Sequence, residues 1–161
     1  MALRICPVSD EDIRALVDLT LLAFVPIFES FERILGSSVY QHIWPDWRAG
    51  QRDAVETMCG DREKYTVLVA NLDGRAVGFV AHTMDDESKT GEIQFIAVHP
   101  EHQNCGIATE LCNAALEQMK ERGMTFARVE TGGDPSHVPA RRAYEKAGFT
   151  GLPLVRYFKK L

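Results

Sequence analysis

The chain has 161 residues and a formal net charge of −5, without a lysine- or arginine-rich run. This argues against nucleic acid and anionic membranes as partners, although not against a cationic substrate. Its content of 45% hydrophobic and 25% charged residues is ordinary for a soluble globular protein, and its length fits one domain. We find no apolar stretch approaching about 18 residues and no leader pattern, and we therefore expect a cytoplasmic protein.

The N-terminal third is expected to hold one strand followed by helices. Residues 3–8 predict a short strand, and the acidic residues after it open a helix that should stop before Pro26. Aromatic and aliphatic side chains crowd into residues 26–47 and predict a second helix packed on a sheet. A further helix is expected over residues 46–58.

The middle of the chain predicts a hairpin and then a central strand. Residues 64–70 and 76–82 predict two strands, and Asp73-Gly74 between them is a strong hairpin signal because both turn positions need positive φ. An acidic turn leads into the strand at residues 92–98, which ends before Pro100.

Helices and strands alternate over the rest of the chain. The pattern predicts a helix from Gly106 to Gly123, a strand at 124–129, a helix at about 139–147 and a last strand at 154–159. Together these elements predict an α/β fold, a mixed sheet with helices on both faces.

The run from residue 92 to residue 122 combines a strand, a polar loop and a helix. A helix N-terminus offers unpaired N–H groups and the positive end of the helix dipole, so the loop before it suits a phosphate or pyrophosphate. Gly106 and Ala108 would let a ligand approach the backbone closely. A nucleotide P-loop and a dinucleotide-binding fold are both excluded, because their glycine, lysine and acidic signatures are missing.

Two blocks of sequence resemble the GCN5-related N-acetyltransferases (GNAT). Gln103-x-x-Gly106-x-Ala108, after Ala97-Val98-His99-Pro100 and before Leu111, looks like the acyl-CoA pyrophosphate loop of that family. Some 40 residues later, 140–149 is similar to its second signature, a short helix with a tyrosine that closes on Gly-Phe. The match covers roughly residues 62–160.

The resemblance implies a single GNAT domain over residues 1–161. Its sheet would be mostly antiparallel, with a splayed central strand pair that receives the pantetheine arm. Residues 92–122 would be the pyrophosphate-binding unit, and residues 10–60 a variable helical segment on the acceptor side.

The resemblance also implies acetyl-CoA as the acyl donor, without a metal. The backbone of Ile96, Ala97 and Val98 would bond the amides of the pantetheine arm as a substitute strand would. The other expected coenzyme A contacts are Gln103, Asn104, Cys105, Gly106, Ile107, Ala108, Thr109, His137, Ala140 and Tyr144.

The implied reaction is direct transfer of the acetyl group to a primary amine of a small molecule or peptide. An ammonium has no lone pair, so a base must first take its proton; Glu92 is the first candidate and Glu130 the second. Tyr144 is expected to protonate the leaving thiolate. Phe28, Glu29, Glu32 and Gln94 are expected on the acceptor side, since such pockets are mainly apolar with a few polar groups.

One position departs from the family pattern. His137 stands seven residues before the tyrosine, where the family often has asparagine, so it could fill the same hydrogen bond or titrate near the ordinary histidine value of about pH 6.5. A zinc site at His99, His102 and Cys105 is disfavoured, because a fourth ligand is missing. The cysteines are expected to be reduced.

Two other functions stay open from the sequence. One is an enzyme of the same fold that uses a longer acyl-CoA, and the other is a module that binds acyl-CoA without catalysis. A homodimer is expected only at the level of the family.

Overall fold

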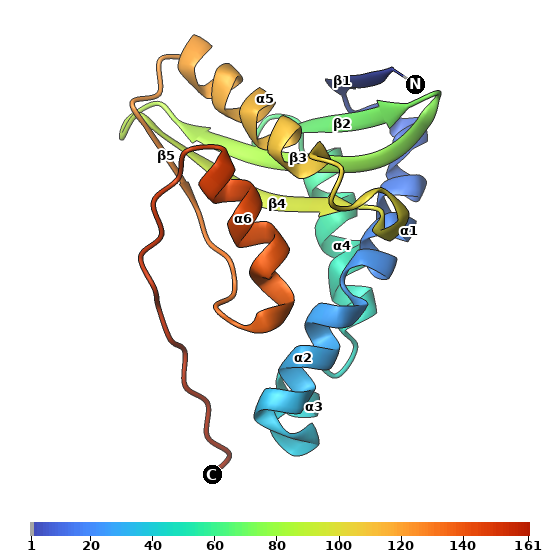
Figure 1. The fold of residues 1–161 in the computed structure, drawn as a ribbon, viewed down its shortest axis with the longest axis vertical. Coiled ribbons are helices and arrows are strands. Elements are labelled where there is room, and N and C mark those ends of the chain that lie inside the picture. The colour runs from blue at the N-terminus through green and yellow to red at the C-terminus, as the bar shows by residue number, and fades with distance from the viewer. Residues whose placement is uncertain (1) are drawn as a thin grey trace.

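The computed structural model describes residues 2–161 of the chain. Figure 1 shows its helices and strands. In chain order they are β1 (Leu3–Pro7), α1 (Ile13–Ala23), α2 (Val25–Leu35), α3 (Ser37–Ile43), α4 (Trp47–Gly60), β2 (Thr66–Leu72), β3 (Arg75–Asp85), β4 (Thr90–Val98), α5 (Ile107–Glu121), β5 (Phe126–Val129) and α6 (Val138–Lys146), with short 3-10 turns at Asp10–Asp12, Pro100–His102 and Pro135–His137.

The five strands form one sheet in the order β1-β2-β3-β4-β5. Strands β1 to β4 pair antiparallel, and β5 pairs parallel to β4. A parallel pair needs a crossover, which α5 supplies between β4 and β5. The mixed, mostly antiparallel sheet that the sequence predicts is therefore confirmed.

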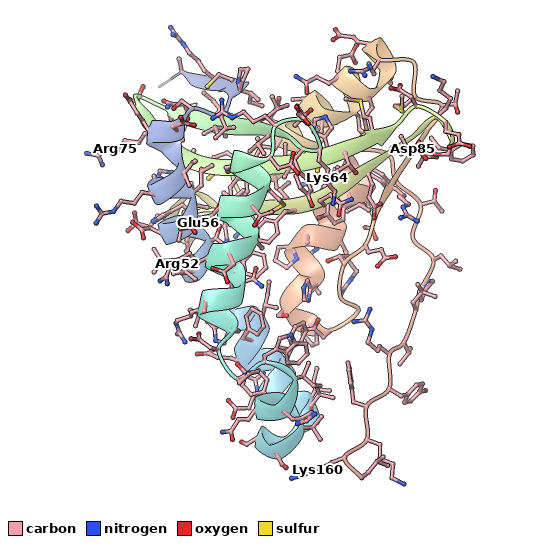
Figure 2. The ribbon with its side chains drawn as sticks, turned by 180° about the vertical axis from the view of Figure 1, so that it is seen from behind. Arg52, Glu56, Lys64, Arg75, Asp85 and Lys160 are labelled. Atoms are coloured by element: carbon pink, nitrogen blue, oxygen red, sulfur yellow. The ribbon has the colours of Figure 1, made fainter. Side chains whose placement is uncertain are left out.

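Helices cover both faces of the sheet and bury one apolar cluster on each. On one face α5 and α6 contribute Leu111 and Tyr144 to a cluster with Val80 and Ile93. On the other face α1 and α4 pack against Phe79 and Ala97, among others. Figure 2 shows α4 in front of the sheet, with the exposed side chains of Arg52 and Glu56 on it. The two sets of helices thus approach the sheet from opposite sides.

A tight turn between β2 and β3 and a bulge in β4 are two local features of the central sheet. The β2–β3 turn has Asp73 at φ 50° and Gly74 at φ 86°, as the hairpin signal predicts. In the β3–β4 ladder, Ala81 is opposite Phe95 but His82 is opposite Ile93, so β4 carries an extra residue, Gln94. This bulge turns Ile93 toward α5 and Phe95 toward α1.

The helical structure of residues 26–47 differs from the sequence prediction. Residues 26–47 form two helices rather than one, because Gly36 adopts φ 77° and ψ 152° between α2 and α3. Its aromatic side chains pack on one another: the rings of Phe28 and Trp47 stack at 4.3 Å, and those of Phe31 and Trp44 at 4.9 Å. These contacts hold α2, α3 and α4 together as one layer.

The strand predicted at residues 154–159 is not formed. Residues 150–161 run as an exposed extended segment along the molecule, away from the sheet (Figure 1). Within residues 2–161 the segment contacts α3 and the residue after it, through the Lys160–Ser38 hydrogen bond and the Phe158–Trp44 ring contact. Strand propensity alone is insufficient, because a strand also needs a hydrogen-bonding partner.

A histidine is buried in the middle of the sheet. His82 is 0% exposed, and neither ring nitrogen has a hydrogen-bond partner among residues 2–161. Burial lowers its pKa from 6.5 to about 4, because the charged ring would lose its hydration. The folded protein therefore holds this ring neutral at a pH where the unfolded chain would charge it.

We expect the protein to lose stability on acidification through His82. Between pH 6.5 and about 4 the unfolded chain binds a proton that the folded chain does not, so the free energy of unfolding falls by up to about 3 kcal/mol as the pH falls. Above pH 6.5 the group contributes nothing to this dependence. Denaturant titrations of His82→Leu should show a shallower fall than wild type, whereas the exposed His42→Leu control should match wild type. Equal pH dependence in all three proteins would contradict the assignment.

Candidate active site

A cavity opens where β4 and β5 separate. The two strands pair only from Thr90 to Ile93 and from Phe126 to Val129. Beyond that point the chain after β5 runs away from the sheet to the start of α6, close to α2 (Figure 1). The cavity between them has a volume of about 500 Å³ and is lined by β4, the loop before α5, α6 and the end of α1. Its size suits a small-molecule site.

The loop before α5 presents a helix N-terminus to this cavity. Gly106 is the N-cap at φ 84°, in the left-handed region that favours glycine, and no side chain caps the helix there. The first N–H groups of α5, at Ile107, Ala108 and Thr109, are therefore free of a capping side chain, and all three residues line the cavity. Such an end attracts an anion.

Hydrogen bonds within the loop hold it against β4. The Gln103 side chain donates from Nε2 to the carbonyl oxygen of Val98 at 3.0 Å. Asn104 takes φ 60°, which lets the chain turn sharply before Gly106. Cys105, a predicted contact, is exposed and is not among the residues that line the cavity; its thiol donates to the carbonyl of Gln103.

One edge of β4 faces the cavity with its backbone. Ile96, Ala97 and Val98 pair with β3 on one side only, because β5 has already separated. All three line the cavity. Their remaining polar groups can therefore meet a ligand that has amides of its own, although the Val98 carbonyl already accepts from Gln103.

Tyr144 brings a phenol from α6 into the same cavity. The residue is 7% exposed, and its ring packs edge-on against Phe149 at 6.0 Å. Its hydroxyl makes no hydrogen bond with residues 2–161, yet it is not sealed from solvent, so it opens to the cavity. Burial, and then the nearby Cys112, raise the pKa of the phenol, which keeps its proton at neutral pH.

The two predicted bases lie in different surroundings. Glu130 is exposed and lines the cavity just beyond β5. Glu92 lies on the paired part of β4, where its carboxylate accepts from Arg128 at 2.7 Å, and it is not among the lining residues. The structure thus brings Glu130 to the cavity of Tyr144 and holds Glu92 in an ion pair outside it.

Only one of the four residues predicted on the acceptor side lines the cavity. This residue is Gln94, whose amide donates to Thr83. Phe28 is buried between aromatic rings of the helical layer, Glu29 is exposed, and Glu32 accepts from Ser37. The helical repeat predicts that α2 packs on the rest of the protein, but it cannot show which turn reaches the cavity.

Sequence reasoning missed several residues of the cavity wall. They lie just after α1, on α2, on the loop after β5, or on α6, and they are Phe24, Ile27, Thr131, Ser136, Pro139, Arg142 and Lys146. Arg142 and Lys146 are four residues apart, so they share one side of α6. This four-residue spacing of two basic residues in the sequence could have predicted a positively charged side of the cavity.

The residues weighed for zinc are only partly brought together. His99, Glu101 and His102 offer ligand atoms within 4.8 Å of one another, and Cys105 is not in this group. The four cysteines are free, with Cys59 and Cys112 buried. Across residues 2–161, the structure contains no helix with the length and apolar character of a membrane span.

His137 sits at the start of α6, against α2. It lines the cavity, its ring stacks on Phe31 at 5.7 Å, and its Nδ1 lies 2.5 Å from Oδ1 of Asp134. Asp134 also accepts from Ser30 of α2 at 2.7 Å. The predicted contact residue is therefore part of a hydrogen-bonded group that joins two elements.

Comparison with known proteins agrees with this geometry. The chain is 39% identical over 88 residues to an uncharacterized N-acetyltransferase of Archaeoglobus fulgidus. This match covers 52% of this chain and 58% of the length of the relative. The fold is that of a GNAT acetyltransferase structure from Desulfovibrio desulfuricans, with a TM-score of 0.71, 19% identity and 94% and 87% of the two chains covered.

The chain also resembles a second solved structure and matches a family model. PaiA N-acetyltransferase from Thermoplasma acidophilum, solved in complex with coenzyme A, matches with a TM-score of 0.68 at 17% identity and covers 90% of this chain and 88% of its own. The family model described as acetyltransferase (GNAT) family matches residues 36–149. This chain therefore belongs to the GNAT acetyltransferase family.

Proposed function

We propose that this protein transfers an acetyl group from acetyl-CoA to a primary amine of a small molecule or peptide by direct attack. The observation that carries the proposal is that one cavity holds both the uncapped N-terminus of α5 and the hydroxyl of Tyr144. The first suits the diphosphate of coenzyme A, and the second suits the sulfur at the other end of its arm. PaiA, which shares the fold, was solved with coenzyme A.

The residues divide into a donor side and an acceptor side. The loop at 103–108 would hold the diphosphate, and the free edge of Ile96 to Val98 would align the pantetheine arm. The backbone N–H of Ile96 is our candidate donor to the oxyanion that forms on the thioester carbonyl. Phe24, Ile27 and Gln94 lie on the cavity wall near the acceptor helices and would meet the amine.

Two alternatives are distinguished by turnover. A sensor of acyl-CoA would bind coenzyme A tightly without releasing thiol in the presence of any amine, and it would not need a protonated phenol beside the ligand. An enzyme for longer acyl-CoA would prefer those donors over acetyl-CoA. Thiol release measured with a panel of amines and acyl chain lengths separates the three functions.

The loop assignment predicts a selective loss of coenzyme A affinity in Gly106→Val. A side chain at φ 84° is strained by about 1–2 kcal/mol, and relaxing that strain would turn the first N–H groups of α5 away from the anion. We expect calorimetry to show an affinity at least about tenfold lower, or about 1.4 kcal/mol.

Gly123→Val is the matched control for this experiment. Gly123 follows the C-terminal end of the same helix at φ 83°, with no atom near enough to clash with an added Cβ. Its substitution should lower the melting temperature by a similar amount and leave coenzyme A affinity unchanged. Equal affinity losses in both variants would mean that the loop effect is only global destabilisation.

Tyr144→Phe is expected to remove catalysis while keeping binding. The hydroxyl has no hydrogen-bond partner among residues 2–161, so its loss should cost little stability. Loss of the proton donor should lower kcat about 10²–10⁴-fold. Thiol release and coenzyme A calorimetry on the same preparation test both statements. A variant with wild-type kcat would rule out Tyr144 as the acid.

We also propose that two copies associate through the segment at residues 150–161. Leu152, Leu154 and Val155 of this segment are each at least 74% exposed. Strand β5 has a single neighbour, β4, within residues 2–161, and its Phe126 is 74% exposed. An unpaired edge and an extended apolar segment can pair between copies.

The association predicts a change of mass on truncation. Light scattering after size exclusion should give a dimer for the full chain and a monomer for a chain that ends at Gly151. Leu154→Asp should weaken the dimer, whereas Arg156→Gln should not, because only the first places a charge within the apolar contact. A monomeric full chain would exclude this interface.

A further inference from the structure

We infer that His137, oriented by Asp134, takes the proton from the acceptor amine. This inference rests on the proposed acetyl transfer and assigns to His137 the removal of the amine proton, for which Glu92 or Glu130 was expected. It depends on four observations: a fixed tautomer, a free nitrogen, a loop shaped around the pair, and a position two helical turns from Tyr144.

The tautomer of His137 follows from the charge of its partner. Burial alone would raise the pKa of Asp134, but hydrogen bonds from Ser136, Ser30 and His137 outweigh it and lower the pKa to about 2. The carboxylate is then ionised at neutral pH and can only accept. Because Nδ1 of His137 lies 2.5 Å from Oδ1 of Asp134, Nδ1 must carry the hydrogen. The lone pair of the neutral ring is consequently on Nε2.

The second nitrogen is available to a substrate. Nε2 of His137 makes no hydrogen bond within residues 2–161, and it is not sealed from solvent as both nitrogens of His82 are. The side chain is 14% exposed and lines the cavity. An imidazole with one nitrogen fixed by a carboxylate and the other open is the arrangement of a general base.

The loop before α6 is shaped around this pair. A Cβ at Gly132 would overlap Nδ1 of His137 and Oδ1 of Asp134, so only glycine leaves room for the pair. Arg141 donates to the carbonyl of Gly132 at 2.6 Å and to that of Asp134 at 2.9 Å, which fixes the loop backbone. On the far side Phe31 stacks on the imidazole.

The positions of His137 and Tyr144 suit the two ends of one reaction. Seven residues of helix separate them by about 10 Å along the axis. Helical side chains point toward the N-terminus, so the long phenol of Tyr144 reaches back toward His137 and shortens this gap. The remaining space would hold the thioester carbonyl with the attacking nitrogen on one side and the sulfur on the other.

The charges around the imidazole can be named. Asp134 contacts it directly, and the Arg141 guanidinium lies on the loop backbone. The other titratable groups that line the same cavity are His102, Glu130, Arg142, Tyr144 and Lys146. From α2 the contacts to the pair come from Phe31 and Ser30, which are neutral. The carboxylate of Asp134 would stabilise the imidazolium that forms.

The protons balance in this scheme. His137 Nε2 takes one proton from the ammonium and releases it to solvent, and the freed lone pair attacks the thioester carbonyl. As the tetrahedral intermediate collapses, the C–S bond breaks and Tyr144 gives its proton to the sulfur. The second proton of the nitrogen then restores the phenol. The products are an amide, a free thiol and one proton in solution.

A purely structural role for the pair makes different predictions. Asp134 accepts from the Ser136 N–H as an N-cap and joins α2 to the loop through Ser30, so the group could serve only to lock these elements together. A lock would lower stability when broken, but it would not determine how the rate depends on pH.

The test uses His137→Asn in the full chain, with the exposed His42→Asn as control. Asparagine can still donate to Asp134 but cannot accept a proton at neutral pH. We expect kcat to fall about 10²–10⁴-fold, with coenzyme A affinity and melting temperature near wild type. The plateau that follows the acid limb of the wild-type rate profile should disappear, because the residual rate should keep rising about tenfold per pH unit as free amine accumulates. His42→Asn should match wild type.

Two results would overturn the inference. One is a plateau of the rate profile that persists in His137→Asn and disappears instead in Glu130→Gln. The other is a nitrogen NMR spectrum of histidine-labelled protein in which the hydrogen of neutral His137 is on Nε2 rather than Nδ1. The spectrum needs no turnover, so it tests the pair even if no amine is acetylated, an outcome that would refute the proposed function separately.

Discussion

The parting of β4 and β5 is the constraint on which the rest of the structure depends. A parallel pair normally continues as long as both strands remain straight, but here the ladder ends after Ile93 and Val129. The bulge at Gln94 lies one residue beyond that end and turns the following side chains of β4 to the opposite face. Phe95 and Ala97 then pack toward α1, while the unpaired edge of β4 faces the cavity.

Both sets of helices use this opening in different ways. From one face, α5 directs its N-terminus at the cavity and α6 contributes Tyr144; from the other, Phe24 just after α1 and Ile27 of α2 line it. The aromatic layer behind them is continuous: Trp44 stacks on Phe31, and Phe31 stacks on His137. The side chains that line the cavity are therefore fixed by one packed assembly rather than by separate loops.

Features of the fold and cavity that arise from neighbours in sequence could be predicted, and those that arise from distant contacts could not. The hairpin at Asp73-Gly74 and the turn at Gly106 depend on local backbone geometry, which glycine and aspartate signal directly. The Ser30–Asp134 hydrogen bond joins residues 104 apart, and no local pattern indicates it. The segment at 154–159 contains residues that favour strands, such as Val155, Tyr157 and Phe158, yet whether it forms a strand depends on a partner that its sequence does not identify. Phe28 is an aromatic residue of the kind that often lines pockets, but the aromatic rings around it place it in the packed core.

The Ser30–Asp134 bond also bears on the order in which this molecule assembles. Contacts between residues so far apart form after local ones, because closing a long loop costs conformational entropy before the contact returns any of it. A chain growing from the ribosome could fold α1 to α4 and pair β1 to β3 well before residue 134 is synthesised. The His137–Asp134 pair would then form late. An incompletely synthesised chain would contain α1 to α4 before it contained this pair.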